Sequence, residues 1–165
     1  MRAVVQRVRS ARVEVEGEVV GAIGPGLLAL IGFGRGDTSE DRAWVLTKIA
    51  NLRVFEGDAA DTTDPQARIA ARKMDRSVSE IGGAVLLVSQ FTLYGDVLRG
   101  RRPSFDDAMP PEQAQAAYDA AVREMRAMGV RVETGRFRAA MDVHSHNDGP
   151  VTLWIDSAVR RSSPR

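Results

Sequence analysis

The apolar residues of this chain fall into short continuous runs and into stretches with regular spacing. Two continuous runs, residues 27–33 and 84–88, are rich in aliphatic side chains and are typical of strands buried on both faces. Shorter strands are predicted by alternation or by flanking turn residues at 3–8, 12–16, 18–23, 53–55, 130–134 and 153–156. Gly17 separates two of these strands and predicts a hairpin.

Two helices are predicted from apolar positions at helical spacing. The first covers residues 39–52, and Thr38 with Asp41 three positions later forms a capping signal before it. The second begins at Pro110-Pro111 and ends near Gly129. Its apolar stripe predicts a buried face and consists of Ala114, Ala117, Tyr118, Ala121, Val122 and Met125.

No internal repeat or linker divides the chain, so the pattern predicts one α/β domain over residues 1–156. Residues 56–68, rich in Asp, Thr and Pro, predict an exposed loop, and residues 157–165 predict a disordered basic tail. The length of 165 residues allows a substantial core. No stretch has the roughly 18 consecutive apolar residues of a membrane span.

Composition narrows the possible chemistry. The chain has no Cys, which excludes disulfides, thiolate metal sites and a cysteine nucleophile, and fits a cytoplasmic protein. The net charge of +1 does not by itself indicate nucleic-acid binding. Among the basic residues only Lys48 and Lys73 are lysine, and the abundant arginine suits phosphate recognition.

The strongest candidate site follows the second buried run. Ser89, Gln90, Phe91 and Thr92 stand where a buried strand ends, a common place for sites in α/β sheets. A hydroxyl nucleophile needs a general base, and the sequence places none beside Ser89 or Thr92. Backbone N–H groups at this strand end could instead stabilise an oxyanion. Alternatively, the polar side chains only satisfy backbone groups there.

A rival site lies later in the chain. On an extended strand Asp142, His144, His146 and Asp148 share one face. Imidazole and carboxylate groups in this arrangement could hold a divalent metal ion, which would make the protein a metal-dependent hydrolase. The alternative is a polar strand face without a metal.

Arginines follow the candidate site directly. Arg99, Arg101 and Arg102 lie in a predicted loop over residues 95–105. They are either solvated surface residues or contacts to RNA phosphates. A third hypothesis is therefore an RNA-binding module without catalysis, for which the few aromatic residues offer little base stacking.

Two motifs together resemble the signatures of the D-aminoacyl-tRNA deacylase family. They are Ser89-Gln90-Phe91-Thr92-Leu93 and Asn147-Asp148-Gly149-Pro150-Val151-Thr152. The resemblance extends over nearly the whole chain to Asp156, through the segments 5–8, 101–105 and 134–137. It implies a barrel-like mixed β-sheet flanked by helices, a homodimer, and hydrolysis of D-aminoacyl-tRNA and glycyl-tRNA esters without a cofactor or a metal.

The same resemblance implies roles for the motif residues. The backbone of Phe91 and Thr92 would polarise the ester carbonyl, assisted by the 2′-hydroxyl of the terminal adenosine. Ser89 and Gln90 would shape the pocket. A cis Gly149–Pro150 peptide would enter the site of the partner subunit and reject L-aminoacyl groups. The supporting residues would be Arg7, Val151 and Thr152. From sequence alone, Gly149–Pro150 is also consistent with a simple turn before a strand.

Overall fold

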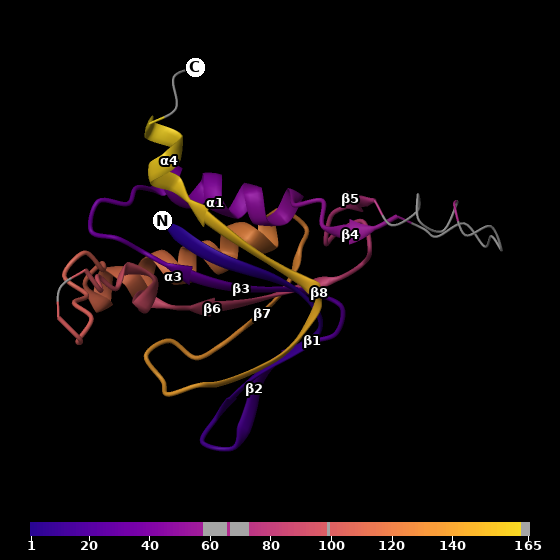
Figure 1. The fold of residues 1–165 in the computed structure, drawn as a ribbon. Coiled ribbons are helices and arrows are strands. Elements are labelled where there is room, and N and C mark those ends of the chain that lie inside the picture. Colours follow the sequence, from indigo (N-terminus) through magenta and orange to yellow (C-terminus); the bar gives the residue numbers. More distant parts are fainter. Residues whose placement is uncertain (58–65, 67–72, 99, 163–165) are drawn as a thin grey trace.

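The computed structural model describes residues 1–57, 66, 73–98 and 100–162 (Figure 1). The strands are β1 (Arg2–Val15), β2 (Glu18–Ile23), β3 (Gly26–Gly32), β4 (Phe55–Glu56), β5 (Met74–Arg76), β6 (Ala84–Ser89), β7 (Arg131–Thr134) and β8 (Asp142–Asp156). The helices are α1 (Ser39–Asn51), α3 (Pro111–Ala127) and α4 (Ser157–Ser162), with a short 3-10 helix η1 (Phe91–Tyr94). Among these described helices, none is long and apolar enough to cross a membrane.

Six strands form one mixed sheet that curls into a nearly closed barrel. The strand order is β2-β1-β3-β6-β7. β8 lies outside this order and pairs with β1. β3, β6 and β7 run parallel, and β1 is antiparallel to β2, β3 and β8. The curl brings β2 against β7, so that a Cβ on Gly21 would lie 2.2 Å from the Thr134 carbonyl oxygen. The barrel-like mixed sheet that the family resemblance implies is therefore confirmed.

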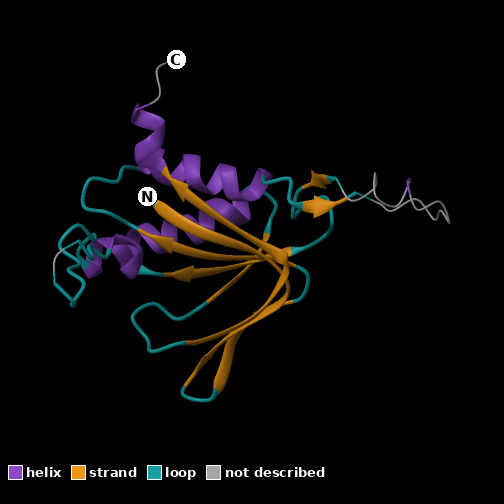
Figure 2. Cartoon of the chain, viewed as in Figure 1, coloured by secondary structure: helices purple, strands orange, loops and turns teal. Residues whose placement is uncertain are grey.

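Two cores stabilise the sheet, one on each face. α1 and α3 cover the outer face (Figure 2), where Leu46 and Met125 pack with Val85 and Leu87 of β6. The inner face holds a second apolar cluster that includes Leu86. β6 is therefore buried on both faces, as its continuous apolar run predicts.

Local signals at the helices are confirmed. Thr38 and Asp41 form the predicted capping box, with each side chain accepting a hydrogen bond from the backbone of the other. The predicted stripe of α3 faces the sheet, and the buried Tyr118 donates a 2.7 Å hydrogen bond from its hydroxyl group to the carbonyl oxygen of Leu87. The spacing of apolar residues thus placed both main helices correctly.

β1 is a single strand where the sequence predicted two. Ala3 and Val5 pack in the outer core, whereas Val13 and Val15 pack in the inner one. The pairing of β1 with β8 shifts register twice between Gln6 and Ser10, so the strand bends and exchanges its buried face. That exchange interrupts the alternation of apolar residues, which is why the pattern indicated a break.

The prediction of a disordered tail from residue 157 is wrong for residues 157–162, which form α4. Ser157 is buried, donates its backbone N–H to the carbonyl oxygen of Met1 and accepts a hydrogen bond on its hydroxyl from the Met1 ammonium. Arg160 lies 3.6 Å from the Glu40 carboxylate at the start of α1. These contacts order the segment, and residues 163–165 lie outside the described residues.

Two further predictions concern the region after α1. A strand was predicted at residues 53–55, and the structure instead has β4 at Phe55–Glu56. β4 pairs with β5 in a separate two-stranded sheet. Most of the loop predicted over residues 56–68 lies outside the described residues.

Candidate active site

A pocket of about 710 Å³ opens at the carboxyl ends of β3 and β6. Because these two strands are parallel, the residues after them meet at the same edge of the sheet. Three of the four predicted catalytic residues, Ser89, Gln90 and Phe91, line the pocket. The other walls are mainly apolar and include Phe33, Phe105, Met109, Ala114, Phe137 and Met141.

The polar residues of the first motif lie where β6 turns into η1. The backbone N–H of Gln90 donates to the Ile31 carbonyl oxygen at 2.7 Å, which fixes the turn to β3. The Gln90 side-chain amide donates to the Thr92 hydroxyl. Phe91 is 59% exposed, with its ring 4.9 Å from that of Phe105. Phe91 therefore forms part of the pocket wall and not of the core.

The first turn of η1 leaves two backbone donors available. The N–H groups of Phe91 and Thr92 precede the first i→i+3 bond of the 3-10 helix, which Leu93 donates to Gln90. Within the described part of the chain, neither N–H has a hydrogen-bond acceptor. Phe91 lines the pocket, whereas Thr92, the next residue along the chain, does not.

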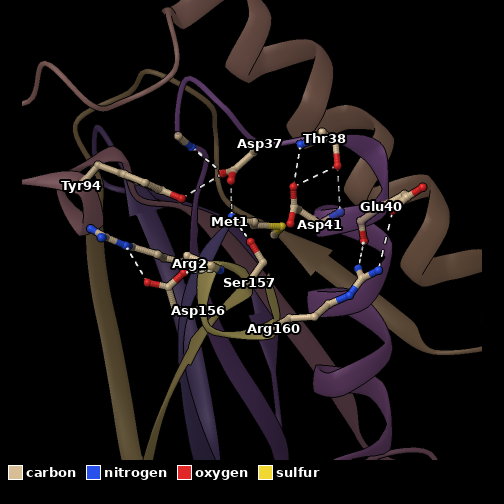
Figure 3. A network of polar contacts seen from close by, with 12 residues as sticks. Met1, Arg2, Asp37, Thr38, Glu40, Asp41, Tyr94, Asp156, Ser157 and Arg160 are labelled. Carbon is tan, nitrogen blue, oxygen red and sulfur yellow. Dashed lines mark hydrogen bonds and ion pairs between the residues drawn. The ribbon is translucent and has the colours of Figure 1, made fainter. Parts of the chain in front are cut away.

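A polar network holds η1 against the start of the chain (Figure 3). The Arg2 guanidinium donates a 2.9 Å hydrogen bond to the Leu93 carbonyl oxygen and lies 4.4 Å from the centre of the Tyr94 ring. The Tyr94 hydroxyl donates at 2.9 Å to Asp37, which also accepts from the Gly34 backbone and from the Met1 ammonium. The start of the chain and the loop before α1 thus position the short helix that carries Thr92.

Asp37 is also the last residue of a glycine-rich stretch, Gly32–Asp37. The glycine spacing of this stretch resembles that of a dinucleotide-binding loop. In the structure this carboxylate is directed at protein donors, where it stabilises the loop before α1.

Both tyrosines of the chain have raised pKa values. Burial raises the pKa of Tyr94, and the adjacent Asp37 carboxylate adds to the effect. Burial also raises the pKa of Tyr118, with Asp119 as the next cause. Because the folded state favours both neutral phenols, their contribution to stability is complete below about pH 10 and is lost as the pH rises above it.

We expect neither tyrosine to ionise in the folded protein near pH 10. In an alkaline titration, tyrosinate absorbance at 295 nm should appear in one step, together with the loss of helical circular dichroism. The control is a Tyr94→Phe/Tyr118→Phe variant, whose stability should depend less steeply on pH above about 10. Tyrosinate formation at the ordinary pKa, with circular dichroism intact, would contradict the prediction.

The second motif forms a protrusion on β8. Opposite the single residue Arg7 of β1, β8 has four residues, 148–151, because Asn147 pairs with Val8 and Thr152 with Gln6. The Gly149–Pro150 peptide within this protrusion is cis, as the family resemblance implies, and both residues are exposed.

Side chains hold the protrusion at its base. The buried Arg7 donates to the carbonyl oxygens of Asp148 (3.0 Å) and Val54 (2.6 Å). The Asn147 side chain accepts from the Val151 backbone at 3.0 Å and donates to the Thr152 hydroxyl at 3.0 Å. The three predicted supporting residues, Arg7, Val151 and Thr152, are therefore all at the protrusion.

The two motifs do not meet within one chain. Arg7 pairs with Leu27 and Leu27 with Val85, four residues before Ser89 on β6. At about 3.3 Å per residue and 4.8 Å per strand, the protrusion is roughly 20 Å along the sheet from Ser89. Accordingly, neither Gly149 nor Pro150 lines the pocket.

Of the residues of the rival metal site, Asp142, His144 and His146 are exposed on the first half of β8, whereas Asp148 is partly buried in the protrusion. His144 and His146 pair with Arg12 and Ser10 of β1 and line a second, smaller pocket. His144 lies 3.6 Å from the Glu14 carboxylate. A side-chain hydrogen bond from Arg12 is the largest cause of the lowered pKa of Glu14. Across the part of the chain that the structure describes, no group of three or more His, Cys, Asp and Glu is arranged to hold a metal ion.

The predicted RNA contacts lie in the loop after η1. Arg101 and Arg102 are exposed there, and backbone hydrogen bonds between Asp96 and Ser104 close its base. Neither arginine lines the pocket, and Arg99 is outside the described residues. Two other arginines, Arg35 and Arg138, do line it. No local pattern in the sequence distinguishes Arg35 and Arg138 from other surface arginines, so neither was predicted as a site residue.

Comparisons with known proteins agree with the two motifs. The profile of a family described as D-Tyr-tRNA(Tyr) deacylase matches residues 4–156. The chain is 55% identical over 157 residues to a D-aminoacyl-tRNA deacylase of Desulfitobacterium hafniense (strain DSM 10664 / DCB-2), covering 95% of this chain and 97% of the relative. It is 50% identical over 163 residues to the protein of that name from Geobacter sulfurreducens, covering 99% of each.

Two solved structures share the fold. One, described as a c-Myc DNA unwinding element binding protein, has a TM-score of 0.83 and 39% identity and covers all of both chains. The other, described as a probable eukaryotic D-amino acid tRNA deacylase, has a TM-score of 0.75 at 19% identity, covering 93% of this chain and 97% of that one, and supports the fold alone. From the profile match and the sequence relatives together, this chain belongs to the D-aminoacyl-tRNA deacylase family.

Proposed function

We propose that this protein is a hydrolase that cleaves the ester bond of D-aminoacyl-tRNA and releases the free D-amino acid and the tRNA. The pocket at the carboxyl ends of β3 and β6 holds the terminal aminoacyl-adenosine. The observation that carries this proposal is the position of Ser89, Gln90 and Phe91 in the pocket wall, at a turn where two backbone N–H groups have no acceptor among the described residues. The reaction removes D residues before translation uses them, and we assign it to the cytoplasm.

The pocket supports a mechanism that relies on the backbone. Among the described residues that line it, none is Asp, Glu, His or Lys. No side chain there can therefore act as an ordinary general base for Ser89. An aminoacyl ester is an activated acyl group, so an oriented water molecule and oxyanion donors are sufficient. The N–H groups of Phe91 and Thr92 supply the donors, and the 2′-hydroxyl of the adenosine assists proton transfer.

Chiral selection is assigned to Gly149 and Pro150. D- and L-aminoacyl groups carry the same substituents, so attractive contacts alone discriminate poorly between them. A rigid wall in the space that an L side chain needs rejects it by steric clash. A D side chain points away from the wall, and a glycyl group has no side chain to clash. The site therefore accepts many D-aminoacyl-tRNAs and glycyl-tRNA.

The wall comes from a second copy of the chain in a homodimer. In one chain the protrusion is roughly 20 Å along the sheet from Ser89, so it cannot complete its own pocket. Within the described residues β8 pairs only with β1, and its other edge is unpaired. Leu153 and Trp154 on this strand are 36% and 54% exposed. An unpaired edge with exposed apolar residues favours association with another chain.

Deacylation of D-tyrosyl-tRNA and L-tyrosyl-tRNA in the presence of EDTA tests the proposal. We expect rapid loss of the D ester, retention of the L ester, and a dimeric mass in solution. Equal loss of both esters would indicate a general esterase. Loss of the D ester only after a divalent metal is restored would favour a metal-dependent hydrolase with Asp142, His144 and His146. Salt-dependent tRNA binding without turnover would leave an RNA-binding module.

A further inference from the structure

We propose that Arg138 binds a phosphate of the RNA strand that leads into the pocket. The inference rests on the proposed function, which places the terminal adenosine of tRNA in this pocket. It assigns to Arg138 a role in affinity for the RNA chain, separate from the ester chemistry at η1.

Arg138 belongs to the segment between β7 and β8 that forms one wall of the pocket. Its neighbours Phe137 and Ala139 are partly buried, and each packs against one of the two cores. Arg138 is exposed, yet it also lines the pocket. The anchored neighbours therefore hold the backbone of Arg138 at the mouth of the pocket.

The backbone of Arg138 is unusual for its residue type. Its φ angle is 60°, in the left-handed region that favours glycine. It occupies the third position of a turn that is closed by the Ala139 N–H and the Arg136 carbonyl oxygen at 3.3 Å. Across the described residues, the other non-glycine residue with positive φ is Glu16, which precedes Gly17 in the β1–β2 hairpin, where such angles are usual. An arginine in this conformation outside a hairpin suggests a function for its side chain.

The charge of Arg138 is available to a ligand. Within the described part of the chain it has no acidic partner and no hydrogen bond from its side chain, whereas Arg2 and Arg42 are paired with carboxylates. Arg35, the other arginine in the pocket wall, donates a hydrogen bond to the Asp106 carbonyl oxygen. An RNA strand whose last nucleoside fills the pocket must pass the mouth with one phosphate per nucleotide. A free guanidinium group there suits such a phosphate.

The salt dependence of RNA binding tests this role directly. The probe is tRNA that carries D-tyrosine through an uncleavable 3′-amide, with its dissociation constant measured between 50 and 300 mM KCl. Replacing Arg138 by Gly removes the charge and suits the backbone, so the melting temperature should not fall. We expect binding to weaken about 5- to 10-fold at low salt, and the slope of log K against log salt to fall by about 0.7.

Three further variants and a second substrate keep the test specific. Arg138→Asn, also neutral and tolerant of positive φ, should reproduce the loss, whereas Arg138→Lys should retain most of the slope. Arg131→Ala removes an exposed arginine at the opposite end of the parallel strands and should leave the slope unchanged. In hydrolysis assays Arg138→Gly should raise KM for D-tyrosyl-tRNA and not for D-tyrosyl-adenosine, which has no phosphate.

An unchanged salt slope in Arg138→Gly, or an equal loss with D-tyrosyl-adenosine, would overturn the phosphate contact. If the proposed function were wrong, the result would differ from both of these outcomes, because the wild-type protein would then hydrolyse neither D-tyrosyl-tRNA nor D-tyrosyl-adenosine. The binding measurement would still report on Arg138 in that case, because it requires no turnover.

Discussion

Thr92→Pro should lower kcat for D-aminoacyl-tRNA by about 10²–10³-fold, the usual effect of removing one oxyanion donor. Proline has no N–H, and the N–H of Thr92 has no acceptor among the described residues, so no folding hydrogen bond is removed. The first turn of a helix also accepts proline most readily. Single-turnover deacylation of D-tyrosyl-tRNA, with KM measured separately, checks the result.

Thr92→Ala is the matched control. It retains the N–H and removes only the hydroxyl, which accepts a hydrogen bond from the Gln90 side chain. We expect a change of less than about tenfold, since the hydroxyl is assigned no part in proton transfer. Equal losses in the two variants would assign catalysis to the side chain, and an undiminished rate in Thr92→Pro would remove the backbone donor from the mechanism.

Gly149→Ala should abolish most of the discrimination between D- and L-tyrosyl-tRNA. Gly149 has a φ angle of 122°, which L residues rarely adopt. A Cβ there would lie 2.7 Å from Nη2 of Arg7 and 3.0 Å from Cγ2 of Val151. The protrusion must therefore move, and a displaced wall no longer fills the space of an L side chain. We expect the D/L ratio of kcat/KM to fall by about 10²-fold or more.

The control for this change is Gly17→Ala, at a glycine of positive φ with open space around it in the β1–β2 turn. It should lower stability slightly and leave the D/L ratio intact. Unchanged discrimination in Gly149→Ala, and likewise in Pro150→Ala, would exclude the wall.

Mixing the two main variants tests whether the wall acts between subunits. In the proposed homodimer, a pair of one Thr92→Pro chain and one Gly149→Ala chain would have one complete site. That site would combine the intact Thr92 of the second chain with the intact Gly149 of the first. After subunit exchange, selective activity should therefore return to up to about half of the sites in mixed dimers. If each protrusion served its own pocket, no intact site would form and no selective activity would return.

Much of the fold was predictable because its signals are local. The apolar spacing of α1 and α3, the capping pair Thr38 and Asp41, and the continuous run of β6 each depend on residues close together in the chain. The position of Ser89 to Thr92 at a strand end was predictable for the same reason. The barrel-like sheet and the family were predicted from the resemblance of the two motifs to known signatures.

Contacts between distant residues decided the rest. No local pattern places Arg7 against Asp148, closes β2 on β7 at Gly21, or brings Arg138 to the mouth of a pocket built by β3 and β6. The bend that joins the halves of β1 depends on register shifts against β8, and α4 depends on contacts with Met1 and Glu40. By itself the sequence determined which residues have the required chemistry, because side-chain type and spacing are local properties. Only the tertiary structure decided which of them share a pocket, because packing and strand register bring together residues that no sequence spacing relates.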